Sequence, residues 1–339
     1  MTAAAGTGDR LHSLGRFRFA CGRELERAEL RYRCIGRLRD DGSNLVLVPS
    51  YYGGSAADLE WLVGPLLDPQ RHCVLLVNSF GNGRSSSPGN SAMGLQEQGW
   101  RIHHSDNVRA QRRLLQEVFG LERVPLILGW SMGAQQAYQW AVQQPERVER
   151  LLCIGGTART SPHNRLFLLS LRQALTTDPH WTGEGFTAEP LAGLRQFATI
   201  YASWAASQAF YRAGGHLQAG CDSVEEYVER FWLPLYRRHD PRNLIAMLDT
   251  WLAHDVSQWR HGGDLAAALA GIRARVMVVG CEQDLYFPPE DLAAEAERIP
   301  GARYRSFASV LGHRAGNPRE APEEQGQLRE ALEVLLAGW

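Results

Sequence analysis

The chain of 339 residues carries a serine in a setting that favours nucleophilic chemistry. Ser131 stands at the centre of Gly129-Trp130-Ser131-Met132-Gly133, which matches the pattern G-x-S-x-G. The apolar run 124–128 predicts a strand directly before the pattern, and residues 134–144 have helical periodicity after it. This strand-turn-helix setting distinguishes a nucleophile elbow from a chance match, because the turn presents the serine hydroxyl beside a helix N-terminus. The sequence therefore predicts that Ser131 is a nucleophile.

A serine hydroxyl needs a base to activate it, and the base needs an acid to orient it. When the serine lies on this kind of turn, the three residues follow one another along the chain as serine, acid and histidine. Asp284 follows the apolar run 275–279, and His313 follows a last predicted strand at 304–307. Glu282 lies on the same turn as Asp284. We predict His313 as the base and Asp284 as the acid, with Glu282 as the competing carboxylate.

Acyl transfer through a serine also requires two backbone N–H donors that stabilise the oxyanion. One donor is expected from Met132, the residue after the nucleophile, and the other from a loop after an earlier strand. The glycine-rich turn at residues 50–54 follows the apolar run 44–48, and Tyr52 is the better candidate within it. A glycine turn with two packed tyrosines is the alternative interpretation of this segment. The predicted oxyanion hole consists of the Met132 and Tyr52 amides.

The elements that would position these residues form an alternating pattern. In addition to the runs already named, residues 73–77 and 150–154 have the composition of buried strands. Continuous apolar strands separated by helices indicate an α/β fold, with a mostly parallel sheet covered by helices on both faces. Residues 17–21 and 28–34 alternate more strongly between apolar and polar side chains, so we expect antiparallel edge strands there.

One long segment breaks this pattern. Residues 161–265 lack strand-like runs and have helix-period segments rich in aromatic side chains. We predict a helical cap at residues 161–265, inserted in a core formed by residues 1–160 and 266–339. The cap should form a lid over the nucleophile, although aromatic residues at helical spacing more often form the core of such a cap than its pocket wall. The candidate wall residues are Trp204, Phe231, Trp232 and Trp251.

Composition excludes several other classes of protein. The formal net charge is −1, with 36 basic and 37 acidic residues interleaved, so no nucleic-acid partner is expected. No apolar segment approaches the length of a signal peptide or a membrane span, so no membrane partner is expected either. The six cysteines have neither C-x-x-C nor metal-ligand spacing. We expect buried free thiols in a cytoplasmic protein and no metal site.

Several short segments carry a family resemblance when taken together. They are Leu30-Arg31-Tyr32, Asn107-Val108-Arg109-Ala110-Gln111, Ser131-Met132-Gly133, Arg242-Asn243-Leu244, Asp284-Leu285-Tyr286-Phe287-Pro288-Pro289 and Gly312-His313. From about Glu24 to His313 the chain resembles the homoserine O-acetyltransferase-like branch of the α/β-hydrolase superfamily. The resemblance implies an α/β-hydrolase fold with an inserted helical cap, and a homodimer associated through that cap.

The departures from the family concern the substrate. Trp130 stands where the family usually has a second glycine, and Arg314 stands where an aspartate usually follows the catalytic histidine. Tyr201-Ala202-Ser203 matches a family triplet whose central arginine is implied to hold the amino-acid carboxylate. Both charged contacts to homoserine are therefore missing or inverted. We name Tyr51, Trp130, Tyr201 and Arg314 as candidate substrate-binding residues.

Two reactions share this machinery and differ only in the acceptor of the acyl group. In an ester hydrolase, water accepts the acyl group and no cofactor is needed. In an O-acyltransferase, an alcohol accepts it and an acyl-coenzyme A thioester is the co-substrate. We favour the hydrolase, acting on a small-molecule ester, because the contacts to the alcohol acceptor are lost. A binding protein without activity is a third reading, which the filled triad positions disfavour.

Overall fold

The computed structural model describes residues 6–337 and contains one sheet of eight strands in the order β1-β2-β4-β3-β5-β6-β7-β8. From β3 onward all neighbouring strands are parallel. Except in the edge strand β8, their cores are continuous apolar runs with almost no exposed surface, which is expected for strands covered on both faces. These strands are β3 (Leu45–Pro49), β4 (Cys73–Val77), β5 (Leu126–Trp130), β6 (Arg150–Ile154), β7 (Arg275–Cys281) and β8 (Arg303–Phe307).

The N-terminal hairpin forms the antiparallel edge of the sheet. β1 (Gly6–Arg18) pairs with β2 (Glu24–Ile35), and β2 pairs with β4, in both cases antiparallel. The prediction of a strand at residues 17–21 was wrong in its position. The chain turns there, with a hydrogen bond of 2.8 Å from Phe19 N to Arg23 O and with Gly22 at φ +88°. Most of β1 lies in the polar stretch before residue 17, where apolar alternation is weak.

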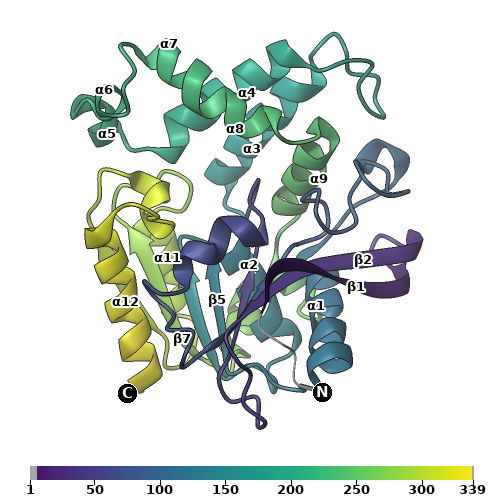
Figure 1. Cartoon of the computed structure of the whole chain (residues 1–339), viewed down its shortest axis with the longest axis vertical. Coiled ribbons are helices and arrows are strands. Elements are labelled where there is room, and N and C mark those ends of the chain that lie inside the picture. The colour runs from purple at the N-terminus through teal and green to yellow at the C-terminus, as the bar shows by residue number, and fades with distance from the viewer. Residues whose placement is uncertain (1–5, 338–339) are drawn as a thin grey trace.

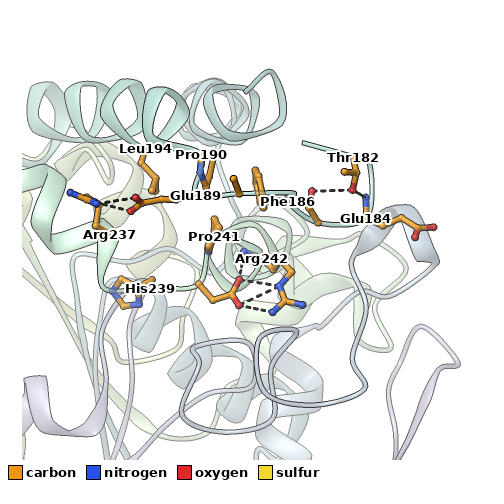
Figure 2. Close-up of a pocket in the computed structure, with 13 residues that line it drawn as sticks. Thr182, Glu184, Phe186, Glu189, Pro190, Leu194, Arg237, His239, Pro241 and Arg242 are labelled. Atoms are coloured by element: carbon orange, nitrogen blue, oxygen red, sulfur yellow. Dashed lines mark hydrogen bonds and ion pairs between the residues drawn. The ribbon is translucent and has the colours of Figure 1, made fainter. Parts of the chain in front are cut away.

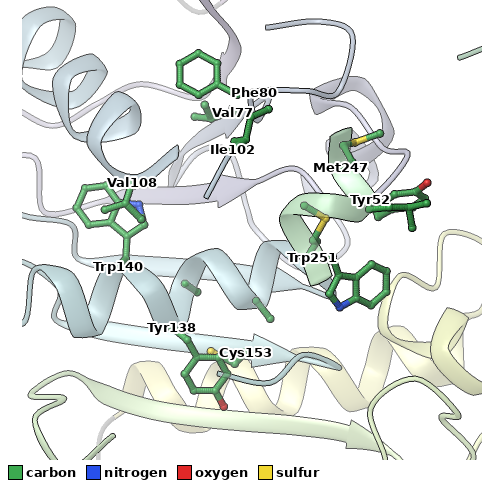
Figure 3. Packing of buried hydrophobic residues seen from close by; sticks show 14 of the residues in the cluster. Tyr52, Val77, Phe80, Ile102, Val108, Tyr138, Trp140, Cys153, Met247 and Trp251 are labelled. Carbon is green, nitrogen blue, oxygen red and sulfur yellow. The ribbon is translucent and has the colours of Figure 1, made fainter. Parts of the chain in front are cut away.

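Helices cover both faces of the sheet (Figure 1). α1 (His104–Phe119), α2 (Met132–Gln143), α10 (Leu265–Ala270) and α11 (Pro289–Ala296) contribute to one apolar cluster. α12 (Pro322–Ala337) packs on the opposite face. Figure 3 shows the first cluster, in which two side chains of α2 point in opposite directions: Trp140 toward Val108 of α1 and Tyr138 toward Cys153 of β6. Because α2 is buried along its whole length, the helix that follows Ser131 is fixed in place.

A helical region lies between β6 and β7 in the chain and stands above the sheet in Figure 1. α3 packs on both α4 and α9, and the short helices form the outer part. Ser161 and Asp240 cap α3 and α9 by accepting hydrogen bonds from backbone amides. We call this region the cap. Its helices are α3 (Pro162–Thr176), α4 (Leu191–Ala205), α5 (Gln208–Arg212), α6 (Gly215–Gln218), α7 (Val224–Tyr227), η3 (Val228–Trp232), α8 (Leu233–Arg237) and α9 (Pro241–Leu252).

The cysteines are all free thiols, and all except the partly exposed Cys21 are buried. Although Cys34 and Cys73 lie far apart in the sequence, their Sγ atoms are 3.4 Å apart across β2 and β4. Within residues 6–337, none of the helices combines the length and the apolar character needed to cross a bilayer.

Candidate active site

Ser131 occupies a strained turn between β5 and α2, with φ +56° and ψ −126°. A non-glycine residue with positive φ is uncommon and persists only where the surroundings hold it. Gly129 and Gly133 make the turn possible, since a Cβ on Gly129 would lie 2.3 Å from the Gly133 carbonyl oxygen. A Cβ on Gly133 would lie 2.7 Å from Pro49 O. The two glycines of the motif thus allow the turn to pack against the end of β3.

The three residues predicted as a triad form one chain of hydrogen bonds. His313 Nε2 lies 2.9 Å from Ser131 Oγ, and His313 Nδ1 lies 2.7 Å from Asp284 Oδ2. With the imidazole proton on Nδ1, the serine hydroxyl donates to Nε2 and Nδ1–H donates to the carboxylate. All three residues are at most 5% exposed. This geometry allows His313 to take a proton from Ser131 while the carboxylate holds the ring.

Asp284 is held by the backbone that follows it. Its Oδ1 accepts hydrogen bonds from the amides of Tyr286 at 2.8 Å and Phe287 at 3.1 Å, which leaves Oδ2 for His313. The competing carboxylate, Glu282, is exposed to solvent. The structure therefore brings Asp284, and not Glu282, to the histidine.

Aromatic rings surround the imidazole of His313. The Trp130 ring stacks on it with centroids 5.0 Å apart and planes at 24°. Tyr286 meets it edge-on at 4.7 Å, and Phe287 lies tilted at 5.4 Å. These rings leave the histidine few directions in which to rotate. Trp130 was predicted at the site, whereas Tyr286 was not, although it lies two residues after Asp284.

The histidine loop is also packed against the cap. Ser207, in the turn between α4 and α5, donates a 2.6 Å hydrogen bond from Oγ to Val310 O. Gly312 adopts φ +59°, and a Cβ there would lie 2.9 Å from Ser207 N. The residue before His313 must therefore be small for the loop and the cap to meet.

The predicted oxyanion loop at residues 50–54 is pinned on several sides. Gln136 of α2 donates to Ser50 O at 2.9 Å, and Asn82 donates to Gly54 O at 3.2 Å. The Tyr52 hydroxyl donates to Leu244 O at 3.2 Å, so its side chain is anchored in the cap. These contacts hold the Tyr52 backbone at the edge of the cavity that also contains Ser131.

Ser131 and His313 open into a cavity of about 490 Å³. Its walls come from the loop after β3, from the cap and from residues 311–321. All four residues predicted to bind substrate line the cavity, as do Phe231 and Trp232 of the cap. Further lining residues were not predicted, since nothing in their spacing marks them: Asp58, Leu235, Tyr236, Arg238, Tyr286, Leu311, Asn317 and Arg319.

Two aromatic residues expected to form the pocket wall pack elsewhere: Trp251 is buried between the cap and the segment after β7, and Trp204 is partly buried. The Trp251 ring is fully buried and stacks on Phe287 with centroids 5.7 Å apart. Trp204 packs on Phe167 at 4.9 Å and parallel to Tyr286 at 6.3 Å. The prediction that they line the pocket was wrong, because helical spacing alone does not separate the two apolar faces of a helix in this setting.

Most polar groups of the cavity are neutral or paired. Burial raises the pKa of Tyr52, Tyr236 and Tyr286 well above the usual value, so these remain phenols. At the rim, Asp58 accepts from Arg319 at 3.1 Å and lies 3.7 Å from Arg238. Although burial alone would raise the pKa of Asp58, the Ser55 hydrogen bonds and the two arginines lower it. Asp58 is therefore a carboxylate that neutralises part of the charge of both Arg238 and Arg319.

A second hollow of about 620 Å³ lies on the cap, between residues 182–194 and 237–242 (Figure 2). Its two arginines are each paired with a carboxylate. Arg237 donates to Glu189 at 2.7 Å, and Arg242 donates to Asp240 at 2.6 Å. This hollow is open and holds no part of the Ser131 hydrogen-bond chain, so it is not the candidate active site.

Comparison with known proteins agrees with this architecture. A family model described as the alpha/beta hydrolase fold matches residues 44–310. The chain therefore belongs to the α/β-hydrolase family. It is 38% identical over 299 residues to the ethyl acetate hydrolase of Pseudomonas veronii, covering 86% of this chain and 85% of that one.

Two further relatives represent the two reactions considered above. The solved structure of the acetyl esterase MekB has a TM-score of 0.91 and 34% identity, covering 96% of this chain and 97% of that one. The homoserine O-acetyltransferase of Thermobifida fusca is 32% identical over 327 residues, covering 86% of this chain and 85% of that one. The chain is thus similar to both groups and more similar to the esterases.

Proposed function

We propose that this protein is a serine esterase that hydrolyses short-chain carboxylic esters, acetyl esters among them. The observation that carries the proposal is the hydrogen-bonded chain Ser131–His313–Asp284 at the floor of a 490 Å³ cavity with aromatic walls. A cavity of this size suits a small ester. The identity to an ethyl acetate hydrolase and to an acetyl esterase supports hydrolysis over transfer.

In the proposed mechanism, Ser131 Oγ attacks the acyl carbonyl while His313 Nε2 takes its proton. Asp284 keeps the ring in the tautomer that accepts at Nε2 and stabilises the imidazolium. The Met132 and Tyr52 amides donate to the oxyanion. His313 then protonates the departing alcohol, which leaves an acyl-Ser131 ester. Water attacks this ester with His313 as base, which releases the acid and restores Ser131.

The alternative acceptor is an alcohol, with an acyl-coenzyme A as donor. The contacts that would orient an amino-acid acceptor are not provided here, since Arg314 and Ala202 occupy the two positions concerned. Ala202 is buried within α4 and offers no charge. Hydrolysis requires no such contact, and it needs neither a metal nor a cofactor.

The test follows acid release from ethyl acetate at constant pH, with and without homoserine. A second series uses acetyl-coenzyme A as donor. We expect acetate release that homoserine does not change, and a loss of about 10⁴-fold or more in kcat for Ser131→Ala. Insensitivity to prolonged dialysis against EDTA is expected as well. Acetylated homoserine as the main product, or near-normal turnover by Ser131→Ala, would contradict the proposal.

We further propose that the protein is a cytoplasmic homodimer associated through the cap. Large apolar side chains exposed on three helices of the cap, α3, α6 and α7, support this assembly, since a dimer would remove them from water. They are Leu166, Leu169, Leu217 and Val224. Sedimentation equilibrium tests it: Leu166→Glu should yield monomers, and a wild-type monomer at micromolar concentration would contradict it.

The cytoplasmic location is supported by the Cys34 and Cys73 thiols, which lie close together without forming a disulfide and so fit a reducing compartment. Fractionation of cells would test this location.

A further inference from the structure

Arg314 is a charged side chain in the active-site cavity with no carboxylate to neutralise it. It follows His313 directly and lines the cavity that contains Ser131. Across residues 6–337, no Asp or Glu oxygen lies within ion-pair distance of its guanidinium. The rim arginines of the same cavity, Arg238 and Arg319, share Asp58 instead. Arg314 therefore differs from the other arginines of the cavity in its charge environment.

Aromatic groups of the cap hold the Arg314 guanidinium in place. Its Cζ atom lies 5.3 Å from the ring centroid of Phe231, 5.9 Å from Phe210 and 6.0 Å from Trp232. Nη1 donates a hydrogen bond of 3.1 Å to the Tyr227 hydroxyl. These contacts come from α5, α7 and η3, and none of them carries a negative charge. The cation is thus fixed without being neutralised.

The way in which the guanidinium is held leaves it able to bind a ligand. A guanidinium stacks through its flat faces and donates hydrogen bonds from its edge, where it carries five N–H groups. The ring contacts of Arg314 are cation–π contacts, and its hydrogen bond to Tyr227 uses one of the five N–H groups. A partly desolvated cation with spare donors is suited to a planar anion, above all a carboxylate. Because Arg314 lines the same cavity as Ser131 and His313, a carboxylate of the substrate can reach it.

We propose that Arg314 is a specificity-determining residue that binds a carboxylate of the substrate, so that the esterase prefers esters carrying such a group. The inference rests on the proposed ester hydrolysis and adds a substrate class to it. The carboxylate could belong to the acyl part, as in the monoester of a dicarboxylic acid, or to the alcohol part, as in an O-acetylated hydroxy acid. Both present the same anion to Arg314, and the experiment separates them.

The experiment compares two pairs of esters of similar size. Monoethyl succinate and ethyl butanoate differ by a carboxylate on the acyl side, and acetoxyacetate and ethyl acetate differ by one on the alcohol side. In the wild-type enzyme we expect kcat/KM of the carboxylate ester to exceed that of its neutral partner about tenfold or more in one pair. Added NaCl should reduce that preference, because salt screens the charge pair.

Variants locate the preference at Arg314. Arg314→Gln should lower kcat/KM for the preferred carboxylate ester about ten- to hundredfold and change the neutral esters by less than about threefold. Arg314→Lys keeps the charge and should retain part of the preference. Arg237→Gln is the matched control, since it removes one positive charge from the cap at the other hollow (Figure 2) and should change neither pair.

Three outcomes would overturn the inference. If the wild-type enzyme hydrolyses the neutral esters and disfavours the carboxylate ester in both pairs, the substrate class is wrong while the esterase function stands. If Arg314→Gln lowers all four rates equally, the residue only joins the cap to the histidine loop. If the wild-type enzyme hydrolyses none of the four esters, the proposed function fails together with the inference. If Arg314→Gln does not fold, the wild-type comparison still tests the substrate class, and Arg314→Lys tests the role of the residue.

Discussion

The indole of Trp130 lies stacked on the imidazole of His313, with ring centroids 5.0 Å apart and an interplanar angle of 24°. Trp130 is held in turn by Tyr51, whose ring meets it at 4.4 Å, and by Gly316, where a Cβ would lie 2.5 Å from the indole. The residue before the nucleophile in the motif thus supports the residue that we propose as the base. It also places a π face beside a ring that becomes a cation during the reaction.

Replacement of Trp130 should therefore slow the chemical step. Trp130→Leu is expected to lower kcat for ethyl acetate about three- to thirtyfold, since a desolvated cation–π contact contributes about 0.5–2 kcal/mol. Trp130→Phe keeps a π face and should retain most of kcat. Steady-state kinetics with thermal melts as a folding control would measure both. Equal losses for the two variants would indicate that ring size, and not the π face, matters.

The two carboxylates after β7 should differ sharply in effect. Asp284→Asn is expected to lower kcat about 10⁴-fold, because an amide cannot hold the same histidine tautomer. Glu282→Gln changes an exposed side chain on the same turn and should alter kcat by less than about twofold. Each of the two variants removes one negative charge from the same turn, so a difference between them reflects the position of the carboxylate and not the loss of charge. A large loss for Glu282→Gln would show that the acid had been assigned to the wrong residue.

Glu295 should make the protein less stable at alkaline pH. It lies on α11 and accepts hydrogen bonds from Ala158 N at 2.7 Å and Arg159 N at 3.3 Å. Burial raises its pKa from 4.5 to about 8, with Asp291 raising it further and the backbone hydrogen bonds and Arg298 lowering it. Because the folded state holds this proton more tightly, the stabilisation is full below about pH 4.5 and is lost as pH rises through about 8.

Urea unfolding between about pH 5 and about pH 9 would measure this effect. Glu295→Gln, which has no proton to lose, should flatten the decline in unfolding free energy that the wild-type protein shows. The control is Glu297→Gln, which changes the exposed residue that follows the last residue of the same helix and should leave the slope unchanged. An identical slope in wild type and Glu295→Gln would contradict the prediction.

His254 should have the opposite dependence, on the acid side. Its Nε2 lies 3.0 Å from Thr157 O, and burial lowers its pKa from 6.5 to about 4, against the opposing effects of that carbonyl and Asp255. The unfolded chain binds the proton more readily, so the stabilisation is full above about pH 6.5 and is lost as pH falls toward about 4. The unfolding free energy, measured by denaturant titration, should fall by about 1–3 kcal/mol less on acidification in His254→Gln than in the wild-type protein. The exposed His180→Gln is the control and should leave this fall unchanged.

The proposed chemistry could be predicted from sequence more completely than the pocket. Ser131, His313 and Asp284 each follow a strand of the parallel sheet, and parallel strands bring their carboxyl ends to one edge. Strand order and spacing therefore sufficed to place them together. The strand before Ser131 was predicted two residues early, because Pro125 lies in an apolar run whose first residues precede β5.

The pocket wall depends on packing that a linear pattern does not contain. Phe231 and Trp232 line the cavity, whereas Trp204 and Trp251 pack on other aromatic rings, although all four have similar helical spacing. The side on which each ring lies is decided by how α4, η3 and α9 cross one another. The Cys34 and Cys73 contact was missed for the same reason, since it depends on the pairing of β2 with β4.

The contact between Gly312 and Ser207 limits how this enzyme can exchange parts with its relatives. The cap is continuous in the chain and could be transferred by recombination at its two ends, as a cassette that alters the pocket wall and leaves the strands intact. The turn at Ser207, however, rests where a Cβ at position 312 would lie. A foreign cap would have to bring a turn that fits the resident histidine loop. Cap and loop are therefore expected to be inherited together, so chimaeras that move both should outperform those that move the cap alone.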